Sequence, residues 1–254
     1  MWEFSLNIKT ENLELANKAK KMLSQYFEVI SGLVTTHQDE DYISILVASQ
    51  EERKELSKRA IISVVVDVIC NDFKETFLEK YLFLPSGDKI GMFAFKKALL
   101  NFDRETDKYI VRKMLNVEHD LYLESFYHFK LQSLQNKWAE LVSLANENRD
   151  YLLSNESFID LLKFLVDNLD ICEDEISIVK EDGGYRIYTE DNSYANSLLN
   201  EENVVPSVID LSPQKINLYF NETSNAIDLL EQIFEERITK NNLSFQNIKK
   251  FKLN

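Results

Sequence analysis

The sequence predicts an α+β protein: a central all-helical block with one long helix, flanked by an N-terminal β-α-β-β piece and a C-terminal hairpin-helix-strand-helix piece. Apolar residues alternate with polar ones near both ends of the chain, as in strands with one buried face, and recur every three or four residues between them, as in amphipathic helices. Only 5 glycines and 3 prolines occur in 254 residues, which argues against long linkers. We therefore expect four parts: an N-terminal α/β subdomain at 1–50, a helical block at 51–170, a C-terminal α+β subdomain at 171–238 and a basic tail at 239–254.

The N-terminal part is expected to hold one helix and three strands. Residues 2–8 alternate as a strand, and residues 13–26 carry an apolar stripe at helical spacing. Residues 28–35 and 42–48 are rich in Val, Ile and Thr and flank the polar loop 37–41, which predicts a hairpin.

The helical block is expected to open with an unusually long helix at 51–84, because apolar side chains from Ala60 to Phe77 form one stripe opposite charged residues. The sequence Pro85-Ser86-Gly87 ends this helix, since proline disfavours helical geometry in the residue before it and glycine supplies the turn. Helical spacing predicts further helices at 88–101, 104–117, 123–148 and 155–169.

Strand alternation returns in the C-terminal part. Residues 175–180 and 185–189 flank Glu181-Asp182-Gly183-Gly184, a sequence that favours a hairpin turn because glycine tolerates a positive φ. A short helix at 204–211, a strand at 215–220 and an amphipathic helix at 223–238 follow.

The charge and cysteine content exclude several classes of protein. A formal net charge of −14 disfavours binding to nucleic acid, which depends on clustered Lys and Arg. The two cysteines, Cys70 and Cys172, stand far apart without a metal-ligand spacing, so neither a disulfide framework nor a zinc module is expected. No apolar run approaches the roughly 18 residues of a membrane span, and no secretory leader is recognisable. We expect a soluble cytoplasmic protein.

The stretch from Leu123 to Trp138 is rich in aromatic residues and raises the question of a chemical site. On a helical wheel, Trp138 falls on a long apolar stripe, whereas Phe126 and Phe129 form a second apolar face on the first turns. This pattern predicts that all three fill space between packed layers. Lys130 lies between the two faces, where we expect an ion pair with Glu124 or with an acid on another helix.

Two chemical alternatives exist in the same stretch. Asp120, Glu124 and His128 are spaced by four, which would align three metal ligands if one helix ran unbroken through Leu121; we expect a break at 119–122 instead. Ser125 and His128 lack an evident third partner for nucleophilic catalysis, and the chain has no glycine-rich phosphate loop. We therefore predict no catalytic residue, no metal ligand and no cofactor.

Three segments resemble the YtxC-like family of sporulation proteins from endospore-forming bacteria: 66–82, 123–131 and 158–166. Their order and separation also look like the family's, and the likeness covers most of residues 50–238. The distinctive element resembles a Gly-Phe-x-x-Phe-Arg pattern, with Ser125 in place of Gly and Lys130 in place of Arg. The cysteine pair that often follows the last helix in the family has no counterpart in Thr239-Lys240-Asn241-Asn242.

The resemblance implies a sporulation-associated cytoplasmic protein, and we expect a non-catalytic interaction or regulatory protein with an unknown protein partner. The alternative is a small-molecule-binding protein or enzyme with a pocket between the helical block and the C-terminal sheet. The basic tail interleaves lysines with apolar residues, so it could dock on the acidic body, on a partner or on an anionic membrane surface, or remain a frayed terminus.

Overall fold

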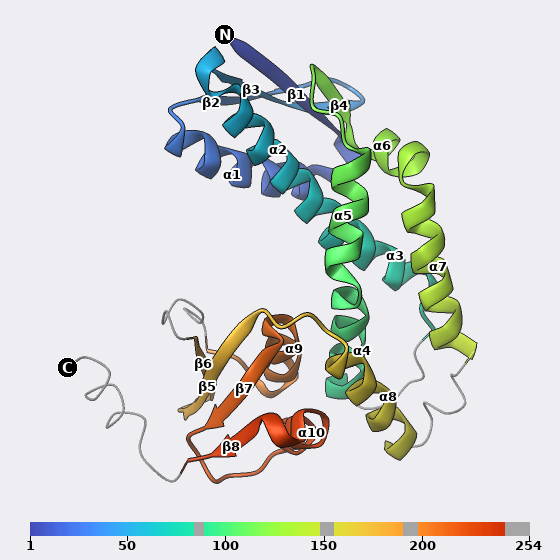
Figure 1. Ribbon diagram of the computed structural model, residues 1–254, viewed down its shortest axis with the longest axis vertical. Coiled ribbons are helices and arrows are strands. Elements are labelled where there is room, and N and C mark those ends of the chain that lie inside the picture. The colour runs from blue at the N-terminus through green and yellow to red at the C-terminus, as the bar shows by residue number, and fades with distance from the viewer. Residues whose placement is uncertain (84–88, 148–154, 190–197, 242–254) are drawn as a thin grey trace, which may run out of the picture. The chain divides into compact units, whose positions relative to one another are not determined.

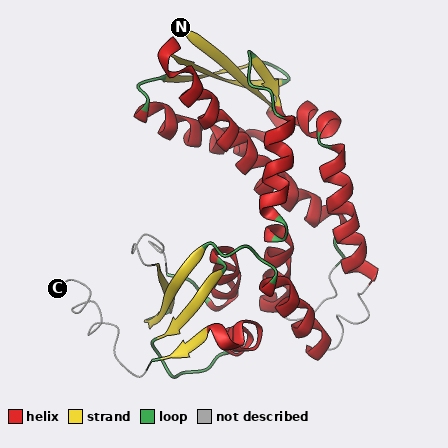
Figure 2. Ribbon diagram, viewed as in Figure 1, coloured by secondary structure: helices red, strands yellow, loops and turns green. Residues whose placement is uncertain are grey.

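The computed structural model describes residues 1–83, 89–147, 155–189 and 198–241. These residues form helices and two four-stranded sheets, which confirms the predicted α+β class (Figure 1, Figure 2). Contacts divide the chain into two compact units. Unit 1 comprises Met1–Tyr81 and Arg104–Val142, and unit 2 comprises Leu82–Asp103 and Ser143–Asn254. Among the described residues, no helix is both long and apolar enough to cross a bilayer.

This division differs from the predicted boundaries at residues 50 and 170. Helices of the expected helical block contact elements of different units: α2 (Lys54–Val68) packs against α1 (Leu13–Val29) in unit 1, whereas α4 (Lys89–Asn101) packs against α9 (Glu201–Leu211) in unit 2. The block is therefore shared between the two units instead of forming a part of its own.

The sheet of unit 1 has the strand order β2-β3-β1-β4. Its first three strands and the first helix form the predicted β-α-β-β arrangement, in which β3 pairs with both β1 and β2 in antiparallel fashion. The fourth strand was not predicted, and it runs parallel to β1. The bounds are β1 Trp2–Lys9, α1 Leu13–Val29, β2 Leu33–Gln38, β3 Tyr42–Ser49 and β4 Asp120–Tyr122.

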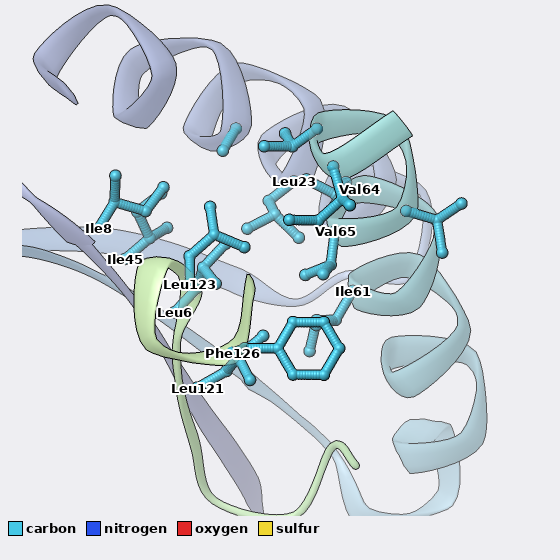
Figure 3. Packing of buried hydrophobic residues seen from close by; sticks show 14 of the residues in the cluster. Leu6, Ile8, Leu23, Ile45, Ile61, Val64, Val65, Leu121, Leu123 and Phe126 are labelled. Carbon is cyan, nitrogen blue, oxygen red and sulfur yellow. The ribbon is translucent and has the colours of Figure 1, made fainter. Parts of the chain in front are cut away.

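One face of this sheet carries the core of unit 1. Alternate residues of the paired strands are buried, as the two-residue period requires. Figure 3 shows Leu6, Ile8 and Ile45 of the strands close to apolar side chains of the helices. The helix side chains labelled there are Leu23 of α1, Ile61, Val64 and Val65 of α2 (Lys54–Val68), and Leu123 and Phe126 of α6 (Leu123–Lys130).

The predicted long helix is present as a continuous helical run. It consists of α2 (Lys54–Val68), a π-helical turn (Ile69–Phe73) and α3 (Lys74–Tyr81). The π-helical turn was not predicted. The residues expected to end the helix, Pro85-Ser86-Gly87, lie outside the described part of the chain.

The prediction of a single helix at 123–148 is wrong. Helix α6 (Leu123–Lys130) ends before Leu131, whose φ of −105° and ψ of 28° are not helical, and α7 (Gln132–Glu147) follows. The Gln135 side chain donates a 2.7 Å hydrogen bond to the carbonyl of Tyr127. In a continuous helix this carbonyl would accept from the backbone of Leu131, so the side chain satisfies the acceptor at the break. The remaining helix of unit 1 is α5 (Arg104–Met114).

Unit 2 contains the predicted hairpin-helix-strand-helix order and a further short strand. Its sheet has the order β6-β5-β7-β8, with β5 antiparallel to β6 and parallel to β7. Gly183 in the hairpin turn has a φ of +90°, which explains the glycine there. The bounds are α4 Lys89–Asn101, α8 Asn155–Asp167, β5 Glu173–Glu181, β6 Gly184–Thr189, α9 Glu201–Leu211, β7 Pro213–Leu218, α10 Asn225–Phe234 and β8 Ile238–Lys240.

The start of the predicted basic tail belongs to this sheet. Strand β8 pairs with β7 in parallel, with Thr239 opposite Asn217. The backbone of Asn241 then donates a 2.8 Å hydrogen bond to the carbonyl of Leu218. Residues 242–254 lie outside the described part of the chain.

Candidate binding groove

The aromatic residues singled out from the sequence occupy different environments. Phe126 and Trp138 are 6% and 1% exposed and belong to the core of unit 1. Phe129 is 74% exposed, so the expectation that it fills space between layers is wrong. Helix α6 ends one residue later, and its second apolar face therefore extends only as far as Phe126.

Lys130 does not form the expected bond to Glu124. It is exposed, and among the described residues no acidic group lies within ion-pair distance of it. The Glu124 carboxylate instead accepts hydrogen bonds from the backbone of Lys9 at 3.0 Å and from the side chain of Asn12 at 2.7 Å. Glu124 therefore ties the start of α6 to the connection between β1 and α1.

A buried ionic cluster lies where α3, α5 and α7 meet. The Lys74 ammonium donates to Oδ2 of Asp107 at 2.7 Å, and the Trp138 indole donates to the same oxygen at 3.0 Å. Lys137 donates to the other carboxylate oxygen at 3.2 Å. Burial lowers the pKa of Lys74, and Asp107 opposes this effect by favouring the charged ammonium. Lys74 and Asp107 are buried whereas Lys137 is partly exposed, and together these side chains join the three helices.

The π-helical turn carries one side chain that is buried in the core and one that faces the surface. Cys70 points inward, and burial raises the pKa of its thiol to about 12, with the charge of Asp107 adding to the shift. Asp72 points outward and binds Lys18 of α1 at 2.7 Å. π-Turns occur often near functional sites, and this one borders a cavity.

This cavity, which we call the groove, has a volume of about 940 Å³ and lies entirely within unit 1. Its lining comes from the β1–α1 connection and the first turns of α1, from the π-turn and α3, from α6, and from Gln135 of α7. Aromatic and charged side chains share this lining. The aromatic residues are Phe73, Phe77, Tyr81 and Tyr127, and the charged residues are Lys9, Glu11, Glu14, Lys18, Asp72, Lys80 and Glu124.

The aromatic side chains of the groove contact one another. The ring centroids of Phe73 and Tyr127 lie 4.7 Å apart, and those of Phe77 and Tyr81 lie 4.8 Å apart. Burial raises the pKa of the Tyr127 phenol to about 12, and nearby Tyr81 adds to the shift. These rings give the groove an apolar surface against which another apolar group can pack.

The lysines of the groove already have partners. Lys9 lies 3.6 Å from Glu11, Lys18 bridges Asp72 and Asp67, and Lys80 lies 5.1 Å from the ring centre of Tyr81. In contrast, the Oε2 atom of Glu124 is buried and accepts no hydrogen bond within the described part of the chain. The groove therefore combines an apolar surface with one uncompensated acceptor.

The metal alternative has no geometric support. Asp120 lies on β4 whereas Glu124 and His128 lie on α6, so the three do not share one helical edge. Within the described ranges, no group of three or more His, Cys, Asp or Glu side chains is arranged to hold a metal ion. The His128 ring packs against Tyr127, with centroids 5.1 Å apart.

Sequence reasoning missed both the ionic cluster and the groove. One signal was present: Lys74 stands in an apolar stripe between Cys70 and Leu78, at the four-residue spacing of one helical face. A lysine in that position indicates a buried acidic partner on a neighbouring helix. The groove had no such signal, because segments far apart in the sequence create it.

The structure is that of an α+β protein with an amphipathic groove in unit 1. The chain belongs to the YtxC-like family, whose model matches residues 55–239. The comparison with curated proteins and the comparison with solved structures each give no match. The family match covers α3 and α6, whereas the lining contributed by the β1–α1 connection precedes it.

Proposed function

We propose that this protein is a non-catalytic interaction protein of the cytoplasm, associated with sporulation, and that the groove of unit 1 holds a segment of its partner protein. Membership of the YtxC-like family supports the association with sporulation. The observation that carries the binding role is the groove itself, where neighbouring aromatic rings are bordered by ion pairs. Apolar anchoring surfaces with a polar rim are typical of protein–protein interfaces.

The charged groups around the groove also support recognition over catalysis. General acid–base catalysis needs titratable groups that converge on one reacting atom. Here Lys9 and Lys18 bind acids on the rim, and Lys80 contacts a ring. The net charge of −14 disfavours a nucleic acid as the partner.

The alternative of a small-molecule-binding protein or enzyme receives less support. The groove volume of about 940 Å³ falls within the range of small-molecule sites. However, that alternative expects a pocket between the helical block and the C-terminal sheet, and every residue lining the groove belongs to unit 1.

A capture experiment with a blocked groove tests the proposal. Thr76 is exposed on α3 and lines the groove, so Thr76→Trp fills part of the space while leaving the core intact. The tagged protein is cross-linked in sporulating cells, and the captured proteins are identified by mass spectrometry. We expect the wild type to retain a partner that Thr76→Trp loses.

The matched control is Glu140→Trp, which adds the same bulky side chain at an exposed position of α7 outside the groove. This variant should capture the partner as the wild type does, and both variants should keep the wild-type melting temperature. Equal capture by Thr76→Trp and the wild type would show that the groove is not the recognition surface.

A further inference from the structure

We propose that the groove recognises a lysine or arginine side chain presented by an apolar segment of the partner, with the Glu124 carboxylate as its acceptor. This inference rests on the proposed function and specifies the chemistry of the partner. It starts from one side chain whose two oxygen atoms have different environments. Oε1 of Glu124 accepts two hydrogen bonds, whereas Oε2 is buried and has no partner among the described residues.

A carboxylate oxygen that is shielded from water and accepts no hydrogen bond is destabilising. Glu124 is only 6% exposed, so bulk water has little access to it. A donor from a bound segment would remove this penalty on binding. A cationic donor does so most effectively, because charge-assisted hydrogen bonds are stronger than neutral ones.

Among the described residues, the lysines that line the groove are engaged elsewhere. Lys9 contributes its backbone N–H to Glu124, while its ammonium lies 3.6 Å from Glu11. Lys18 is held by Asp72 and Asp67. The cation that complements Oε2 is therefore expected to come from the partner.

The surroundings of Glu124 suit a long side chain with a charged end. Tyr127 lies three residues further along α6, so both side chains occupy the same helical face, and both line the groove. The Tyr127 ring packs against Phe73, which provides an apolar wall for a methylene chain and a face that attracts a cation. A long, thin side chain such as that of lysine or arginine fits this wall, and its charged end would contact Oε2, which is covered in the unbound protein, once the neighbouring side chains shift.

Conservative substitutions separate this role from folding. In Glu124→Gln, the amide oxygen can still accept from Lys9 and Asn12, while the negative charge is lost. Glu140→Gln is the matched control, since it removes one negative charge at an exposed position outside the groove.

The probe is a short fluorescent peptide that alternates leucine with lysine, together with a counterpart in which glutamine replaces lysine. Fluorescence anisotropy with the full-length protein measures both affinities. We expect the lysine peptide to bind more tightly than the glutamine peptide. Glu124→Gln should weaken binding of the lysine peptide about tenfold, while Glu140→Gln changes neither affinity, and both variants should keep the wild-type melting temperature.

The outcomes distinguish this inference from the proposed function. If Thr76→Trp abolishes peptide binding but Glu124→Gln binds the lysine peptide as tightly as Glu140→Gln does, the groove remains a recognition site and the role of Glu124 is overturned. If neither peptide binds while partner capture still depends on Thr76, the basic-segment chemistry is wrong and the proposed function stands. If Thr76→Trp affects neither peptide binding nor capture, both proposals fail.

Discussion

The ammonium of Lys74 and the carboxylate of Asp107 lie 2.7 Å apart, and each side chain is only 1% exposed. Such a pair is costly to break, because removing one partner leaves the other as an uncompensated buried charge. The Trp138 indole and Lys137 also donate to Asp107, so this carboxylate joins α3 and α7 to α5.

We expect Asp107→Ala to lower the free energy of unfolding by roughly 3–5 kcal/mol, measured by urea denaturation. The double variant Lys74→Met/Asp107→Leu should recover much of that loss, since well-packed apolar residues often replace a buried ion pair without penalty. If Asp107→Ala unfolds at the same urea concentration as the wild type, the cluster does not stabilise unit 1.

The two phenylalanines of α6 should respond differently to truncation. Phe126 is 6% exposed and Phe129 is 74% exposed. Phe126→Ala is therefore expected to cost about 3–5 kcal/mol of unfolding free energy through lost burial and a cavity, and Phe129→Ala less than about 0.5 kcal/mol. Thermal or urea unfolding of the pair measures this difference. Similar losses for both variants would contradict the exposed position of Phe129.

Stability should decline at alkaline pH, in part because of Cys70. Burial raises the pKa of this thiol from 9.0 to about 12, so the unfolded chain releases the proton at a lower pH than the folded protein. The contribution of Cys70 to stability is complete below pH 9 and is lost as the pH rises from there toward 12.

Cys70→Ala removes this contribution to the pH dependence. We expect the wild type to lose roughly 2 kcal/mol more unfolding free energy than Cys70→Ala between pH of about 8 and about 10.5, since the shift is about three pKa units. Urea curves at the two pH values give the comparison. Parallel losses in both proteins would show that the thiol ionises equally in the folded and unfolded states.

The turn between α1 and β2 contains two adjacent residues whose substitution should affect stability differently. A Cβ at Gly32 would lie 2.5 Å from the Phe27 ring and 2.9 Å from the carbonyl oxygen of Ala48. Gly32→Ala should therefore cost about 1–3 kcal/mol. Ser31 has a φ of 54°, so Ser31→Gly relieves strain and should be neutral or slightly stabilising. Melting temperatures of the two variants check the prediction, and a stable Gly32→Ala protein would contradict it.

Local patterns predicted much of the fold. The strand alternation at residues 2–8 and the helical stripe from Ala60 to Phe77 are visible in short windows, because each element buries one continuous face. Strand β4 was missed because it has three residues, and its extended geometry depends on pairing with β1. The break at Leu131 was missed because the side chain of Gln135 takes over a backbone bond.

The candidate site was less predictable than the fold. The environment of Glu124 depends on Lys9 and Asn12, which precede it by more than a hundred residues, so no spacing rule connects them. Phe126 and Phe129 have equivalent apolar side chains on one short helix, and only the end of α6 at Lys130 makes their exposure so different.

Along the chain, segments of unit 1 and unit 2 alternate: a first part of unit 1, a first part of unit 2, the rest of unit 1 and the rest of unit 2. On the ribosome, β1 therefore emerges long before its parallel neighbour β4, and the groove cannot assemble until α6 has been synthesised, because Glu124 follows Lys9 by 115 residues. Every continuous fragment that contains both halves of unit 1 also carries residues 82–103 of unit 2. Translation must therefore deliver part of the second unit before the first one can close.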